Sequence, residues 1–206
     1  RRPDHHQRFW PRSANCTKRQ RGKKKKKPPG RDEDYQVIII RMAYNWKQFT
    51  KKIAIRAPAK AIYEAWATRQ GLESWFLREA VFTRSDGTTR PRHSLVEAGD
   101  RYLWRWHGYH DDVKEEREIT LANGWDKLSF RFSGDCVVTV TILQEAGETI
   151  CQLVQEMPME DTDQQQHYYI ECGNGWAFYL VNLKSVLEGG MDLRNKKTEL
   201  TGVINS

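Results

Sequence analysis

The feature that most constrains the fold is a long amphipathic segment near the C-terminus of the sequence. Its apolar residues step by four and three positions along one face, as in an α-helix; they are Tyr169, Gly173, Trp176, Leu180, Leu183 and Leu187. Thr162 and Gln165 have the spacing of a capping box, and Gly189-Gly190 is expected to end the helix. A helix of about 24 residues, roughly 36 Å long, needs a broad apolar surface to cover it.

The preceding residues are predicted to supply that surface as a sheet. A strand is predicted at 49–56, and Pro58 and Thr68 are placed to begin two short helices. After them the apolar period falls to about two, as in strands. The further predicted strands are 78–83, 101–107, 113–121, 126–132, 136–144 and 148–156, with reversals at Asn123-Gly124 and Ala146-Gly147. This order predicts an α+β fold, with a curved antiparallel sheet of about six or seven strands around one long C-terminal helix.

The basic charge of the chain is confined to its N-terminal segment. Residues 1–41 hold 14 Lys or Arg against 4 Asp or Glu, a net charge of +10, which leaves −3 for residues 42–206 out of the total of +7. We expect residues 1–41 to be a disordered tail and, because Met42-Ala43 resembles a translation start, non-native upstream sequence. The alternative is a nuclear-localisation or nucleic-acid-binding arm. The folded domain is expected at 42–206, without nucleic acid as a partner.

The composition also bears on location and cofactors. No apolar run approaches the roughly 18 to 20 residues of a membrane span, and no secretory signal pattern is present. The cysteines are widely spaced and form no zinc or redox motif; they are Cys16, Cys136, Cys151 and Cys172. We therefore expect a cytoplasmic protein with reduced thiols, without a cofactor, as a monomer or a dimer.

Aromatic residues gather on the predicted inner faces of the strands and helices. They either fill a solid core or line a cavity between sheet and helix that binds a small molecule. The candidate ligand-binding residues are Trp75, Phe76, Tyr102, Trp104, Trp106, Phe130, Phe132, Leu153, Gln155, Trp176, Tyr179 and Leu180. Gln155 is expected either to orient a ligand or to meet solvent at a strand end.

Residues that could carry catalysis are few. His107, His110, Asp111 and Asp112 imitate a metal site, but beside Gly108 they are more typical of an exposed hairpin turn, and we expect no metal. His167 and Cys172 lie five residues apart, so they should occupy different faces of the helix and not form a nucleophilic pair. The glycines of Gly173-Asn174-Gly175 are expected to allow close packing of the helix on the sheet.

Several motifs resemble one known superfamily in their order and spacing. They are Ile-Arg-Ala-Pro-Ala-Lys-Ala-Ile-Tyr-Glu-Ala-Trp (55–66), Gln-Gly-Leu-Glu-Ser-Trp-Phe (70–76), Gly99-Asp100-Arg101-Tyr102, Val138-Thr139-Val140, Gly175-Trp176, Leu183 and residues 187–194. Together they resemble the START-like (SRPBCC) superfamily, also called polyketide cyclase and Bet v allergen-like. Within it they are most similar to homologues of the activator of heat shock protein 90 ATPase. The resemblance covers about residues 49–194.

The resemblance implies a helix-grip fold with a hydrophobic cavity, in which relatives bind lipids, polyketides or other apolar molecules. We accordingly expect an apolar or aromatic small molecule as the ligand. The alternatives are a cyclase or hydrolase with Gln155, His107 or Tyr102 as polar participants, and a chaperone-interacting stress-response domain. The resemblance carries over no catalytic residue. Residues 1–41 are too short and too polar to be the additional N-terminal domain of the eukaryotic co-chaperone, so direct activation of that ATPase is not expected.

Overall fold

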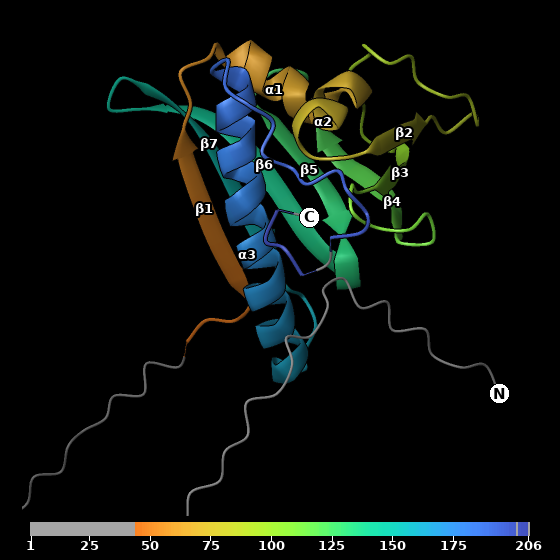
Figure 1. Cartoon of the computed structure of the whole chain (residues 1–206), viewed down its shortest axis with the longest axis vertical. Helices are drawn as coiled ribbons and strands as arrows, with labels where there is room; N and C mark the ends of the chain where they lie inside the picture. The colour runs from red at the N-terminus through yellow and green to blue at the C-terminus, as the bar shows by residue number, and fades with distance from the viewer. Residues whose placement is uncertain (1–43, 201, 206) are drawn as a thin grey trace, which may run out of the picture.

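The computed structural model describes residues 44–200 and 202–205, and these form one antiparallel sheet with three α-helices (Figure 1). In spatial order the strands are β1 (Gln48–Ala54), β7 (Glu148–Glu156), β6 (Cys136–Glu145), β5 (Lys127–Phe132), β4 (Lys114–Ala122), β3 (Arg101–Arg105) and β2 (Glu79–Thr83). The helices are α1 (Ala59–Ala67), α2 (Arg69–Trp75) and α3 (Thr162–Leu187), and a 3₁₀ turn, η1 (Ser133–Asp135), joins β5 to β6. The predicted α+β helix-grip fold is confirmed, and every predicted strand is present.

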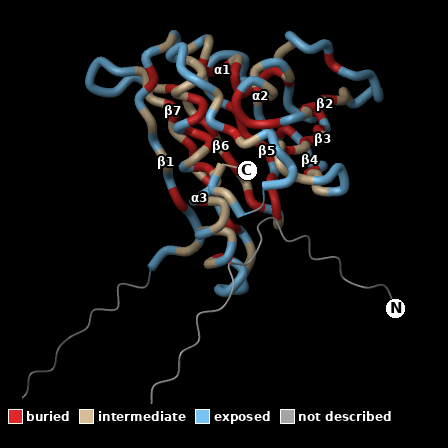
Figure 2. The backbone as a smooth tube through the Cα atoms, in the orientation of Figure 1, coloured by how far each residue is buried: buried red, intermediate tan, exposed pale blue. Residues whose placement is uncertain are grey.

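Helix α3 lies lengthwise against one face of the sheet, while α1 and α2 cover one end of it (Figure 1). The residues that Figure 2 colours as buried follow the strands behind α3 and the inner sides of α1 and α2. The buried residues of α3 include Gly173, Trp176, Leu180 and Leu183 from the predicted apolar face. The packing of this one face against the strands thus produces the single core of the domain.

The ends of the helices follow from local hydrogen bonding. The side chain of Thr68 accepts a 2.9 Å hydrogen bond from the backbone N–H of Gly71 and so caps α2, as predicted. For α3 the predicted capping box is wrong by one residue, because the cap is Asp161, which accepts from the N–H of Asp163 at 2.9 Å. The helix ends as expected, with Gly189 at a φ of 80° just beyond it.

Residues 188–200 run back across α2 and are fastened there by Arg194. Its buried guanidinium donates hydrogen bonds of 2.9 to 3.0 Å to the backbone carbonyls of Glu73, Ser74 and Leu77. These carbonyls lie at the C-terminal end of α2, where a cation also meets the negative end of the helix dipole. Asp192 holds the same guanidinium at 2.8 Å, so the closing segment locks α2 onto the domain.

Two further expectations concern the basic tail and membrane-spanning segments. The predicted basic tail, residues 1–41 with Cys16, lies outside the described residues. Within the described residues, no helix combines the length and the apolar character that crossing a membrane requires.

Candidate functional site

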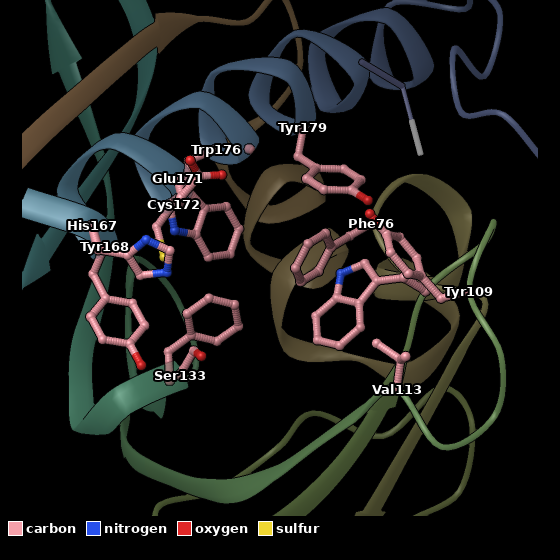
Figure 3. A pocket seen from close by; sticks show the side chains of 13 residues that line it. Phe76, Tyr109, Val113, Ser133, His167, Tyr168, Glu171, Cys172, Trp176 and Tyr179 are labelled. Atoms are coloured by element: carbon pink, nitrogen blue, oxygen red, sulfur yellow. The ribbon is translucent and has the colours of Figure 1, made fainter. Parts of the chain in front are cut away.

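A hollow opens between the N-terminal half of α3, the end of β5 and the connection from β3 to β4 (Figure 3). It spans about 610 Å³ of space between atoms, including its open mouth, and about 50 Å³ of this leaves room for the centre of a water molecule. The lining residues are Phe76, Trp106, Tyr109, Val113, Phe132, Ser133, His167, Tyr168, Glu171, Cys172, Gly175, Trp176 and Tyr179. The space that a molecule could occupy between these walls is therefore small.

The deep walls of the pocket are aromatic rings from four different elements. Phe76, directly after α2, lies with its ring centroid 5.1 Å from that of Trp176 and 4.7 Å from that of Tyr179. Phe132 at the end of β5 approaches Trp176 to 5.4 Å, and Trp106 lies 5.9 Å from Phe76. Such edge and tilted contacts are the favourable arrangements for aromatic pairs, so the walls are set by the core that supports them.

Tyr168 of α3 lies at the rim beside Ser133 (Figure 3). Its ring rests directly on the backbone of Gly134, where an added Cβ would lie 2.2 Å from the ring carbon Cζ. Gly134 also has a φ of 64°, in the left-handed region that favours glycine. The turn η1 thus leaves room for Tyr168 to lie over it at the pocket entrance.

The structure divides the residues expected to bind a ligand into two groups. Phe76, Trp106, Phe132, Trp176 and Tyr179 line the pocket. The others lie in the closed core behind it: Trp75, Tyr102, Trp104, Phe130, Leu153, Gln155 and Leu180. The pocket is therefore displaced toward one end of the predicted aromatic cluster.

Sequence reasoning missed the remaining lining residues, which are Tyr109, Val113, Ser133, His167, Tyr168, Glu171, Cys172 and Gly175. Those on α3 follow a second helical stripe, one position beside the apolar face used for the prediction. Tyr168, Cys172, Gly175 and Tyr179 are spaced by four, three and four residues. That spacing was a usable signal, whereas Tyr109 and Ser133 lie in connections that carry no periodic pattern.

Gln155 faces inward and is fully buried, which rules out the strand-end position in solvent. Its Oε1 accepts a 2.7 Å hydrogen bond from the indole Nε1 of Trp176. Its Nε2 has no hydrogen-bond partner among the described residues, and it lies near the thiols of Cys136 and Cys172. The amide therefore positions one wall of the pocket from behind.

The thiols near the pocket are protonated at neutral pH. Burial raises the pKa of Cys172 to about 12, and it does the same for Cys136 and Cys151. His167 and Cys172 both line this pocket, although they lie five residues apart on α3. Because a thiol with so high a pKa supplies almost no thiolate, Cys172 is not equipped as a nucleophile.

Glu115 of β4 is a buried carboxyl group that does not line the pocket. It is 3% exposed, and its Oε1 accepts no hydrogen bond from any described residue; Arg117 Nε lies 3.4 Å from that atom. Burial raises the pKa of Glu115 to about 7. Burial is the main cause of the raised pKa values of Tyr168 and Cys172, and the charge of Glu115 adds a smaller rise to both.

The loop between β3 and β4 carries the histidines and aspartates that imitate a metal site. Asp111 forms an ion pair with Arg78, while burial, together with Arg194 and Lys196, lowers the pKa of His107 to about 4. Across residues 44–200 and 202–205, no group of three His, Cys, Asp or Glu side chains is placed to hold a metal ion. Tyr109 of this loop instead contributes to the pocket wall.

Gly173 was expected to allow close packing of the helix on the sheet. This expectation is wrong, because the structure leaves room for a side chain at this position. A Cβ added there would lie 4.0 Å from its nearest neighbours, the side chains of Lys51 and Phe49. That is an ordinary van der Waals contact, so a methyl group fits. Gly175 lies on the pocket wall, where the missing side chain leaves space inside the hollow.

We compared the chain with protein families, curated proteins and solved structures. The model of the family described as Activator of Hsp90 ATPase homolog 1-like protein matches residues 56–188. No curated protein matches the chain with significance. The matched residues contain the whole sheet apart from β1, and they contain all of α3.

Solved structures with the same fold include three from different sources. The protein SSP2350 from Staphylococcus saprophyticus superposes with a TM-score of 0.56 at 18% identity, over 71% of this chain and 96% of that one. The Aha1 dimer from Colwellia psychrerythraea gives 0.52 at 19% identity, over 69% and 97% of the two chains. DynU16, from the dynemicin biosynthetic locus, gives 0.56 at 18% identity, over 73% of this chain and 50% of its own. At these identities the likeness establishes the fold.

Proposed function

Because the chain belongs to the family of Activator of Hsp90 ATPase homolog 1-like proteins, we propose that it binds an apolar or aromatic small molecule between the sheet and α3. The observation that carries the proposal is the composition of the pocket. Seven of its thirteen lining residues are Phe, Trp or Tyr, from α3, β5 and the segments that follow α2 and β3. Concave, mostly aromatic surfaces with a few polar groups are typical of small-molecule sites.

The size of the pocket bears on what it holds. The space open to the centre of a water molecule, about 50 Å³, is well below the volume of a site that encloses a drug-sized molecule, which is roughly 300 to 1,000 Å³. A small aromatic molecule suits this volume and this lining better than a whole lipid does. Burial of roughly 200 Å² of apolar ligand surface at about 25 cal/mol per Å² would contribute about 5 kcal/mol before the costs of association. We therefore expect binding that is weak to moderate.

The test fills the pocket without removing any core residue. Gly175→Leu places a side chain from α3 into the hollow, and Ala177→Leu enlarges a side chain on the exposed side of the same helix. Naphthylethanol, a neutral aromatic probe, is titrated into each protein by calorimetry. We expect the wild type and Ala177→Leu to bind it equally and Gly175→Leu not to bind it. Equal binding by all three proteins, or binding by none, would refute the proposal.

A second candidate function is docking to a chaperone, which the description of the family favours. The surface offers an anchor for it, since Trp125 in the turn between β4 and β5 is 69% exposed and Leu121 of β4 is exposed nearby. Exposed Trp side chains are frequent energetic centres of protein interfaces. Retention of purified heat shock protein 90 by the wild type, with loss in Trp125→Ser and no loss in Gly175→Leu, would identify this surface as the functional one.

A further inference from the structure

The outer side of α3 carries no charge along the middle of the helix. Residues 172–183 include no Lys, Arg, Asp, Glu or His. On the side that packs against the sheet, Trp176 and Leu183 are buried. On the opposite side, Ala177 and Val181 are exposed. Because helices that lack charges all round are normally covered all round, this outer side indicates a contact that the single chain does not make.

The exposed residues on this side have the spacing of a helix-packing seam. Ile170 and Ala177 lie seven residues apart, and so do Asn174 and Val181, in a second row that starts four residues later. This is the spacing of the a and d positions along which two helices pack. Ile170 and Val181 are 49% and 51% exposed, and the small Ala177 lets another helix approach closely. We call these four residues the outer seam.

Further exposed apolar side chains lie beside the outer seam. The segment that follows α3 is attached to the helix, because the hydroxyl of Ser185 donates a 2.7 Å hydrogen bond to the carbonyl of Met191. Figure 1 shows α3 and this segment on the same side of the sheet. The exposed apolar residues of the segment are Met191, Leu193, Leu200 and Ile204. The apolar surface therefore continues from the seam onto the segment.

The charges at the two ends of α3 favour a second copy of the chain as the partner of this surface. Residues 156–171 hold five acids and no Lys or Arg, whereas residues 184–199 hold four cations against three acids. Two antiparallel α3 helices would bring the acidic end of each copy to the more cationic end of the other. Two parallel helices would place acids against acids, which is unfavourable across an interface.

We propose that two copies of this chain form a dimer through the outer seam, with their α3 helices antiparallel. A two-fold axis between Asn174 and Ala177 produces this arrangement, since in such an interface the same patch of both copies is used. Ile170 of each copy then faces the partner's Val181, and Asn174 faces the partner's Ala177. The four seam residues do not line the pocket, so the pocket stays available in the dimer.

The size of the surface sets the expected strength of the dimer. For its 26 residues α3 is about 39 Å long, and a helical face roughly 10 Å wide gives about 400 Å² per copy. The exposed side chains of the following segment add to this, so the total reaches the lower end of specific interfaces, about 1,200 Å². We therefore expect a dimer that dissociates on dilution, with a Kd of about 10 µM.

The first test measures the mass of the full chain in solution. Sedimentation equilibrium at physiological salt should show monomers near about 1 µM and dimers near about 300 µM. Ile170→Lys and Val181→Glu each place an unpaired charge in the interface twice, because a two-fold interface contains every contact twice. Each should raise the Kd at least about a hundredfold. A wild type that is monomeric at every concentration, or variants that dimerise equally well, would overturn the proposal.

Mixing the two variants tests the antiparallel arrangement. In a mixed dimer the introduced lysine of one copy faces the introduced glutamate of the other, while the second contact keeps its native Ile170 and Val181. An equimolar mixture should therefore dimerise with a Kd within about tenfold of that of the wild type. In a parallel dimer the two introduced charges would lie about 16 Å apart along the helices and could not compensate each other. A mixture that stays monomeric, with both variants folded by circular dichroism, contradicts the arrangement.

Leu121→Lys is the matched control. Leu121 is also an exposed apolar residue, 37% exposed, but it belongs to β4 and not to α3. This variant should dimerise like the wild type, and an equal loss in Leu121→Lys and Ile170→Lys would count against the seam. A different partner gives a different pattern. If the full chain is monomeric and Ile170→Lys abolishes its retention of purified heat shock protein 90, the seam binds a chaperone and the dimer is refuted.

Discussion

Trp176 and Gln155 are joined by a 2.7 Å hydrogen bond from the indole Nε1 to the amide Oε1, which ties the middle of α3 to strand β7. Both residues are buried, at 2% and 0% exposure. The bond holds the indole ring against Phe76 and Phe132 and so fixes the back wall of the pocket. Within this core the amide is therefore a positioning group for the aromatic wall.

Replacement of Gln155 by Leu should destabilise the domain by about 1 to 2 kcal/mol, because it leaves the buried N–H of Trp176 without a partner. Gln152→Leu on the other side of the same strand should change the stability by less than about 0.5 kcal/mol. Urea unfolding of both variants measures the difference. Equal stability of the two variants would show that the bond contributes nothing.

Replacement of Gly173 by Ala should stabilise the domain by about 0.5 to 1 kcal/mol, since alanine favours helix and its methyl group has room. Gly71→Ala is the contrasting variant, because a Cβ there would lie 2.2 Å from the backbone oxygen of Glu64. It should destabilise the domain. The melting temperatures of the two variants should therefore move in opposite directions, and a fall for Gly173→Ala would contradict the packing seen here.

Replacement of Arg194 by Ala should destabilise the domain by about 2 to 4 kcal/mol, because three carbonyls at the end of α2 and the carboxylate of Asp192 lose a buried cation. Lys196→Ala is the control: Lys196 also pairs with Asp192, but its side chain is 55% exposed. Such an exposed pair should contribute less than about 1 kcal/mol. Denaturant midpoints compare the variants, and a small loss in Arg194→Ala would show that the closing segment is not needed to hold α2.

The buried carboxyl of Glu115 should make stability depend on pH. Its pKa is raised from 4.5 to about 7 in the folded protein, so the folded state retains a proton that the unfolded state releases. Stability should therefore fall as pH rises from about 4.5 to about 7, by about 3 kcal/mol from this group, and then level off. Glu115→Gln should be more stable than the wild type above pH 7, with the difference vanishing at low pH.

Urea unfolding across this pH range measures the effect, and Glu116→Gln should show no such gain, because Lys114 lowers the pKa of that exposed carboxyl. A constant difference between Glu115→Gln and the wild type at every pH would mean that Glu115 does not titrate in this range.

Much of the fold could be predicted because its elements are strongly periodic. The apolar face of α3 and the alternation of β6 and β7 depend on burial, and burial is visible in a single sequence. The family resemblance was confirmed for the same reason, since its motifs include Trp66, Trp75 and Trp176 of the core. The start of α3 was missed by one residue because Asp161 and Thr162 are both capable caps and only the backbone decides between them.

The site was harder to predict. Strand β4 reads Lys-Glu-Glu-Arg-Glu over residues 114–118, and no hydrophobic contrast tells which carboxyl group faces inward. Its pairing with β3 decides this, by placing Glu115 opposite Trp104. Tyr109 and Ser133 reach the pocket from a loop and a 3₁₀ turn, whose paths depend on tertiary contacts. The apolar periodicity of a sequence predicts which residues form the core. It does not predict where the packed core leaves a cavity.

Because the ring of Tyr168 lies on the backbone of Gly134, a substitution at position 134 would act on the entrance of the pocket. A methyl group there would overlap the tyrosine ring, and the left-handed backbone disfavours any such side chain. The ring of Tyr168, which is one of the lining side chains, would have to move, and the entrance of the pocket would change shape. The entrance of the pocket can thus be altered at Gly134, a residue that does not itself line the pocket.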